Sequence, residues 1–170
     1  MNDLSPQERE QTLVRLVQAH ETTLLRLCCA MLGDEQLARD AVQETFFKAF
    51  RRLRSFRGES SEKTWLTRIA INTCRDMRRQ AWFRMEDRSV SLESLPEPAG
   101  PCTQAQSDLA MDVMRLPDRL KEVVLLRCYQ GMTTDEIARA LGVPRRTVSY
   151  RLKRAREALR LEWGEEARHE

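Results

Sequence analysis

Glycine, aromatic side chains and long apolar runs are all scarce in this sequence. Only 6 of the 170 residues are glycine and only 6% are aromatic, whereas sheet proteins need many turns and favour β-branched and aromatic residues. No apolar stretch approaches the roughly 20 residues that cross a bilayer. Arginine, leucine, glutamate, alanine and glutamine dominate instead, and all are good helix formers. We therefore expect an all-α chain that does not insert into a membrane.

The spacing of the cysteines matches neither a disulfide framework nor a zinc site. Their number is odd and no two are spaced as C-x-x-C, which favours a reducing compartment over disulfides and gives no support to a zinc site. The first ten residues are polar and acidic, unlike a signal peptide. We therefore expect a cytoplasmic protein without a metal or cofactor. Buried hydrophobic roles are expected for Cys28, Cys29, Cys74 and Cys128, with Cys102 as an exposed exception.

The usual features of an enzyme are also missing. There are two histidines, His20 on an apolar stripe and His169 near the C-terminus. We find no Gly-rich phosphate loop, no paired-carboxylate site and no nucleophile motif. The sequence therefore predicts a protein that is not an enzyme and has no catalytic residues.

Helical periodicity divides the chain into two parts. A capping box at Ser5 opens three helices, separated at Gly33 and by a loop over 55–61. Helical pattern resumes at residue 107, is interrupted at Pro117 and continues to about residue 160. Between the two parts lies a proline-rich stretch whose net charge over 85–109 is −4. The predicted organisation is a three- to four-helix domain (1–84), a flexible acidic linker (85–106), a helix-turn-helix domain (107–162) and an acidic tail (163–170).

The second domain carries the helix-turn-helix pattern. Thr133 begins a capping box, Gly142 permits a tight turn, and Pro144 opens a longer helix. Residues 144–160 hold seven basic residues and one acid, which suits a major groove lined by phosphates. A solvated helix with ordinary surface charge is the alternative. With the apolar positions facing inward, the outward side chains are Arg146, Tyr150, Lys153 and Arg154.

The first domain has a second basic segment. Residues 63–84 hold six basic residues and one acid, and helical spacing places Arg68, Asn72, Arg75 and Arg79 on one face. Arginines bind phosphates, and an asparagine among them can bond a base edge. An ordinary solvated face is the alternative for the charges. Trp65 is consistent with base stacking or with a core position, since it lies on the apolar stripe.

An acidic segment precedes that basic face. Residues 34–44 hold four acids and one arginine. Acids here would repel phosphate, so they are better explained as a docking face for a basic protein partner. The patch is formed by Asp40, Gln43, Glu44 and Phe47.

Together these motifs resemble the extracytoplasmic function (ECF) group of bacterial RNA polymerase sigma factors. The resemblance lies in DAVQETFFKAFRRLRSFRGESS (40–61), TWLTRIAINTCRD (64–76) and LPDRLKEVVLLRCYQGMTTDEIARALGVPRRTVSYRLKRAREAL (116–159). It implies a specificity subunit that binds core RNA polymerase, reads the −10 and −35 elements of promoter DNA and promotes melting. It also implies regulation by an anti-sigma factor. The alternative is a two-domain helix-turn-helix regulator that binds duplex DNA without polymerase.

The resemblance also assigns residue roles. The acidic patch would dock on the coiled-coil clamp of the largest-type polymerase subunit, and the linker would thread past the polymerase active cleft. A loop containing Phe56, Arg57 and Gly58 would help to capture a flipped base of the −10 element. The −10 contacts would be Phe56, Trp65, Arg68, Asn72 and Arg75, and the −35 contacts Arg145, Arg146, Thr147, Ser149, Tyr150, Lys153 and Arg154.

Overall fold

The computed structural model describes residues 5–85 and 112–159, and none of them lies in a strand. The expected all-α fold is therefore confirmed. The chain divides into two compact units. The first carries α1 to α3, and the second carries α5, α7 and most of α6. Apart from Met85, which ends α3, the predicted linker lies outside the described residues, as do residues 107–111 and the acidic tail.

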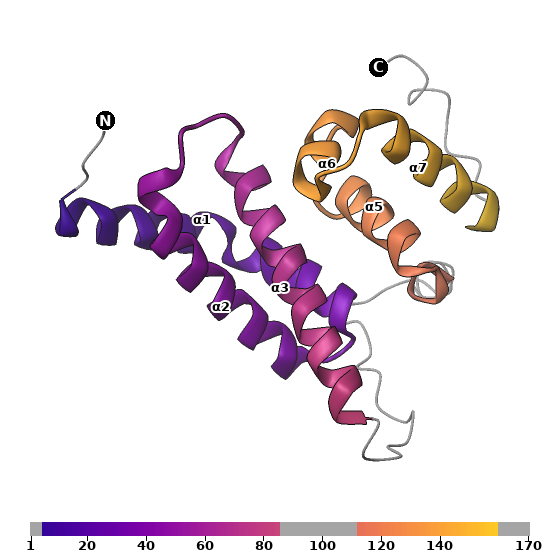
Figure 1. The fold of residues 1–170 in the computed structure, drawn as a ribbon, viewed down its shortest axis with the longest axis horizontal. Coiled ribbons are helices and arrows are strands. Elements are labelled where there is room, and N and C mark those ends of the chain that lie inside the picture. The colour runs from indigo at the N-terminus through magenta and orange to yellow at the C-terminus, as the bar shows by residue number, and fades with distance from the viewer. Residues whose placement is uncertain (1–4, 86–111, 160–170) are drawn as a thin grey trace. The chain divides into compact units, whose positions relative to one another are not determined.

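Within the described residues, six helices and one short 3₁₀ turn have defined bounds (Figure 1). A further helical stretch over 112–115 ends just before Pro117. The elements are α1 (Pro6–Leu32), α2 (Glu35–Arg52), η1 (Leu53–Ser55), α3 (Glu62–Met85), α5 (Asp118–Cys128), α6 (Thr134–Leu141) and α7 (Arg145–Leu159).

The helices of the first unit begin and end at the residues that their capping chemistry indicates. The Ser5 side chain accepts a bond from the backbone N–H of Glu8, and the Glu8 side chain accepts one from Ser5, which completes the expected capping box. Gly33 ends α1 in the left-handed region at φ 70°. Asp34 then caps α2 by accepting from the N–H of Leu37 at 2.7 Å.

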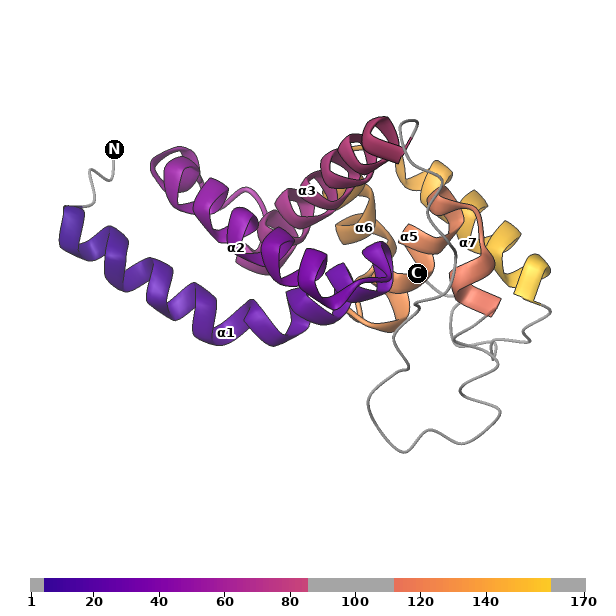
Figure 2. The ribbon, with the colours of Figure 1, turned by 90° about the horizontal axis from the view of Figure 1, so that it is seen from below.

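Three mutually packed helices bury the core of the first unit (Figures 1 and 2). α2 and α3 run antiparallel, joined at one end by η1 and the loop that follows it, and α1 packs against both. Although α1 has 27 residues, no helix in the described part of the chain is long and apolar enough to cross a membrane. The most deeply buried side chains include Leu16, Leu24, Leu27 and Cys28 of α1, Ala38, Ala41 and Ala49 of α2, and Leu66, Ala70 and Cys74 of α3.

The second unit is built on α5 packed against α7. Residues 123–126 of α5 are all buried, and Val148 and Ala155 of α7 are fully enclosed as their inward positions predict. Gly142 ends α6 at φ 66° and redirects the chain into α7. The helix-turn-helix arrangement read from the capping box, the glycine and the proline is therefore present.

The cysteines follow the expectation of burial only in part. Cys28 and Cys74 lie in the core of the first unit, where a hydrogen bond between them and burial raise the pKa of the Cys28 thiol. The same expectation is wrong for Cys128, which is exposed because it ends α5 beyond the buried run. Cys29 is half-buried, and Cys102 lies outside the described residues.

Thr133→Ala should destabilise the second unit by about 1 kcal/mol, because α6 has only eight residues and depends on its cap. Thr133 accepts a bond from the N–H of Glu136, and its own N–H donates to the Glu136 carboxylate at 2.8 Å. Chemical denaturation followed by circular dichroism measures the loss. The neighbouring Thr134→Ala is the matched control, and an equal effect in both variants would contradict a specific capping role.

Candidate nucleic-acid interface

The loop between α2 and α3 brings two aromatic rings together beside the start of α3. The Phe56 and Trp65 ring centroids lie 4.6 Å apart with an interplanar angle of 29°. Ser61 caps α3 by accepting from the N–H of Thr64 at 3.1 Å, and Gly58 turns the loop at φ 70°. The loop therefore presents a stacked aromatic pair in which Trp65 is half-buried rather than enclosed in the core.

This pair lines a surface hollow of about 1110 Å³. Three arginines and two glutamates surround the rings, so the wall is mixed in charge with a basic excess. Such a combination of flat aromatic faces and guanidinium groups suits an unpaired base and its phosphates. The lining residues are Thr12, Leu53, Arg54, Ser55, Phe56, Arg57, Glu59, Ser60, Glu62, Trp65 and Arg68.

The remaining predicted residues of the α3 face lie further along the helix. Asn72 is exposed, one turn beyond Arg68, and does not line the hollow. Arg75 is half-buried, and the exposed Arg79 pairs with Asp76 on the same helix. The structure thus brings Phe56, Trp65 and Arg68 together and leaves Asn72 outside them.

In the second unit, α7 presents a basic surface. Arg146, Ser149, Lys153 and Arg154 are exposed, and the Tyr150 side chain is 63% exposed. Thr147 is half-buried. Arg145 pairs with Asp135 of α6 at 3.5 Å, and Arg154 pairs with Glu157 at 3.3 Å.

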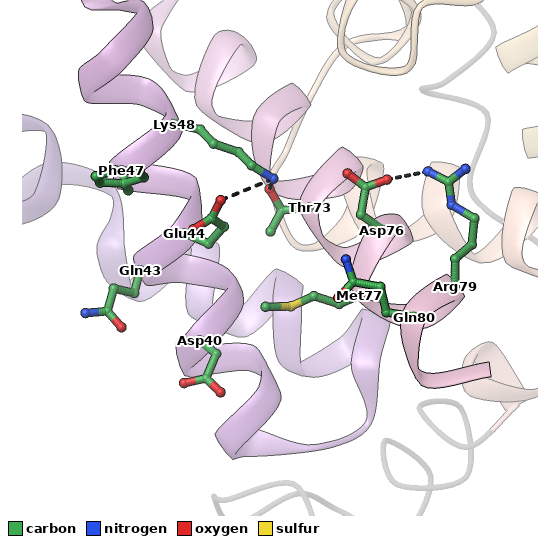
Figure 3. A pocket seen from close by; sticks show the side chains of 10 residues that line it. All are labelled: Asp40, Gln43, Glu44, Phe47, Lys48, Thr73, Asp76, Met77, Arg79 and Gln80. Atoms are coloured by element: carbon green, nitrogen blue, oxygen red, sulfur yellow. Dashed lines mark hydrogen bonds and ion pairs between the residues drawn. The ribbon is translucent and has the colours of Figure 1, made fainter. Parts of the chain in front are cut away.

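The predicted acidic patch lines a groove of about 850 Å³ between α2 and α3 (Figure 3). Phe47 is 56% exposed there, with the guanidinium of Arg51 5.8 Å from its ring centre. Lys48, which the sequence analysis did not single out, lies among the acids, and its Nζ donates to Thr73 Oγ1 at 3.2 Å. The groove residues are Asp40, Gln43, Glu44, Phe47, Lys48, Thr73, Asp76, Met77, Arg79 and Gln80.

Comparison with known proteins identifies the family. Residues 16–84 match the Sigma-70 region 2 family model, and residues 113–159 match that of Sigma-70, region 4. The RNA polymerase sigma-H factor of Pseudomonas aeruginosa is 32% identical, with 90% of this chain and 93% of the relative covered. The ECF RNA polymerase sigma factor SigW of Bacillus subtilis is 30% identical, with 85% of each covered. This chain belongs to the ECF sigma factors.

Solved structures of two proteins have a similar fold. The structure of this chain is similar to that of CnrH, which was solved in complex with the cytosolic domain of CnrY. The TM-score is 0.67 and the sequence identity is 26%, with 89% of this chain and 86% of CnrH covered. The structure is also similar to the sigma factor RpoE of Bartonella quintana, solved in complex with the anti-sigma factor NepR, with a TM-score of 0.71 and 23% identity over 89% of this chain and 93% of RpoE.

Sigma factors are transcription initiation factors that direct RNA polymerase to promoters and are not themselves enzymes. In the part of this sigma factor that the structure describes, no three His, Cys, Asp or Glu side chains gather as metal ligands.

One feature of the hollow escaped the sequence analysis. Glu62, in the first turn of α3, receives two hydrogen bonds from Arg15 of α1. The two residues are 47 positions apart, so no local pattern links them. The Arg15 hydrogen bonds hold the pKa of Glu62 below its ordinary value.

Phe56→Ala should move the fluorescence emission of Trp65 to longer wavelength, because removal of the stacked ring opens one face of the indole to water. The measurement needs a background in which the other two tryptophans, Trp82 and Trp163, are phenylalanine. Phe47→Ala is the control, since Phe47 lines the other groove. An unchanged emission maximum in Phe56→Ala would contradict the stack.

Proposed function

We propose that the first unit of this sigma factor binds the −10 element as single-stranded DNA, that the second binds the −35 element as duplex, and that the two together promote melting. The observation that carries the proposal is the Phe56–Trp65 pair flanked by arginines. An aromatic face gains about 1–3 kcal/mol from a stacked base. A flipped base costs a few kcal/mol, so the hollow offsets much of that cost.

Contacts to the −10 element come from two places, the hollow formed by the α2–α3 loop with the start of α3, and the exposed face of α3 one turn further on. The hollow holds the base and Arg68 binds the adjoining backbone, while the exposed Asn72 reaches a base edge one turn further on. Arg75, which is half-buried, contributes positive charge along the same face. In this arrangement stacking provides affinity and Asn72 provides base selectivity.

The −35 element is read by α7 in the major groove. The exposed polar side chains of α7 lie opposite the buried Val148 and Ala155, so insertion of the helix leaves the core of the unit intact. Tyr150 brings a large side chain with a hydroxyl group to this surface. We assign the contacts to Arg145, Arg146, Thr147, Ser149, Tyr150, Lys153 and Arg154.

The α2 side of the acidic groove docks on the coiled-coil clamp of the largest-type polymerase subunit. Asp40 and Gln43 are exposed, and Phe47 provides an apolar anchor beside them. Glu44 is partly neutralised by Lys48 at 3.6 Å, so Asp40 carries the more available negative charge.

With both DNA-binding units on one chain, binding of one raises the effective concentration of the other, and the predicted linker sets that concentration.

An anti-sigma factor regulates this activity. CnrH and RpoE, which share the fold, were solved in complex with CnrY and with the anti-sigma factor NepR respectively. The site of action is the cytoplasm, where polymerase and chromosomal DNA meet.

The proposed function is tested by run-off transcription with bacterial core polymerase on a library of promoter templates, with and without this protein. A promoter-specific transcript that requires the protein is the expected result, and none on any template would overturn the assignment. A gel shift without polymerase distinguishes the alternative, since a two-domain helix-turn-helix regulator would bind duplex DNA tightly by itself.

Asn72→Ala should reduce promoter opening about tenfold through the lost base contact, while protection of the −35 element stays within about twofold. Permanganate reactivity of unpaired −10 thymines measures opening, and a nuclease footprint measures −35 binding. Gln18→Ala, which removes an exposed amide from α1, is the control. Equal loss at the two elements would argue against the assigned role.

A further inference from the structure

A bidentate ion pair joins the middle of α1 to the first turn of α3. Arg15 Nη1 donates to Glu62 Oε2 at 2.9 Å, and Arg15 Nη2 donates to Glu62 Oε1 at 2.6 Å. We call this pair the Arg15–Glu62 clamp. Both nitrogens of one fork meet both oxygens of one carboxylate, which fixes orientation as well as distance.

The Arg15–Glu62 clamp lies at the edge of the Phe56–Trp65 hollow. Glu62 lines that hollow together with Trp65, which is three residues further along α3. Thr12, one turn before Arg15 on α1, lines the same hollow. The clamp therefore ties the α1 wall of the hollow to the helix start that carries the stacked tryptophan.

Glu62 is an acid in a hollow suited to a polyanion, which makes its pairing important. An unpaired carboxylate there would repel phosphates, whereas Arg15 engages both of its oxygens and keeps it ionised. His20 and Lys63 are the other titratable groups that interact with this cluster, and burial is the main cause that lowers the pKa of His20. The clamp thus presents a neutral pair where a lone negative charge would stand.

The Arg15–Glu62 ion pair is too weak to affect the stability of the whole unit, but it is strong enough to affect the local ordering of one loop. The Arg15 and Glu62 side chains are 56% and 36% exposed, and exposed pairs change an equilibrium by only about two- to fivefold. That is small beside the buried core that joins α1 to α3. The segment over 53–61, however, buries only Leu53, so a factor of this size matters for its local opening.

We propose that Arg15 is a positioning residue that acts through Glu62 to hold the start of α3 and the loop over 53–61 against α1, so that the hollow is preformed for a −10 base. This inference rests on the proposed function of the hollow. Its structural half, the ordering of the loop, is measurable without DNA or polymerase.

The first test is hydrogen–deuterium exchange of the full chain over residues 53–64. Arg15→Ala and Glu62→Gln should each speed exchange about two- to fivefold. The charge-swapped double variant Arg15→Glu/Glu62→Arg should restore at least half of the protection. Arg39→Ala is the matched control, since it breaks an exposed ion pair with Glu35 within α2, and its exchange over 53–64 should be unchanged.

The second test is permanganate mapping of promoter opening on the template selected by run-off transcription. Arg15→Ala should reduce opening about two- to fivefold at unchanged −35 protection. It should reduce opening more than Glu62→Gln does, because only Arg15→Ala leaves an unpaired carboxylate beside the DNA. The swapped variant should recover opening, as expected if the ion pair between the two positions, rather than either side chain by itself, supports base capture.

The outcomes separate the two proposals. Unchanged hydrogen exchange over 53–64 in Arg15→Ala, or no recovery of protection in the swapped variant, would overturn the positioning role of Arg15. That conclusion would hold even if the wild-type protein directs transcription. Normal opening in Arg15→Ala would likewise overturn its role in base capture. If exchange responds and is rescued but the wild-type protein yields no promoter-specific transcript, the loop-ordering role stands and the proposed function falls.

Discussion

The burial of α3 against α1 and α2 sets every surface that the first unit presents. Leu66, Ala70 and Cys74 form a fully buried row at helical spacing, and a helix turns about 100° per residue. Once that row is fixed, Arg68 and Asn72 must point outward. A different rotation of α3 would enclose those polar groups at a cost of several kcal/mol. Small alanines on α2 let the helices approach closely, so the core that stabilises the unit also fixes which polar side chains of α3 are exposed.

Apolar burial and ion pairing act at different scales here. Full burial of a leucine such as Leu27 stabilises by about 1.5–3 kcal/mol, whereas an exposed ion pair contributes about 0–1 kcal/mol. The core therefore determines the fold, and the surface pairs determine the geometry of segments that bury little. The two thiols in the core, Cys28 and Cys74, contribute through apolar burial. Because the Cys28–Cys74 hydrogen bond and burial raise the pKa of Cys28, this cysteine packs as an apolar group rather than reacting as a thiolate.

Local chemistry made most of the fold predictable from the sequence. The Ser5–Glu8 and Thr133–Glu136 boxes and the left-handed Gly142 all act within three to five residues, so their patterns are visible in the chain. The side-chain contacts of the candidate site were harder to predict from the sequence. The Phe56–Trp65 stack, the Arg15–Glu62 clamp and the Lys48–Thr73 bond join residues 9, 47 and 25 positions apart, and such pairs depend on how the helices pack. Periodicity identified the exposed faces but not which side chains meet across them.

Acids pair with arginines on the basic faces of α3 and α7, and under the proposed function these pairs limit how strongly either unit binds DNA alone. Arg79 pairs with Asp76, Arg145 with Asp135, and Arg154 with Glu157. A phosphate that binds one of these arginines must replace a carboxylate rather than water, so the gain per contact is smaller than for an unpaired side chain. Weak contacts at each unit limit non-specific binding to DNA. Two such units on one chain still reach high affinity when a promoter engages both, because the second contact forms at high effective concentration. A net charge of only +3 is consistent with this balance, since the basic segments 63–84 and 144–160 are offset by acids elsewhere in the sequence, chiefly over 34–44, 85–109 and 161–170.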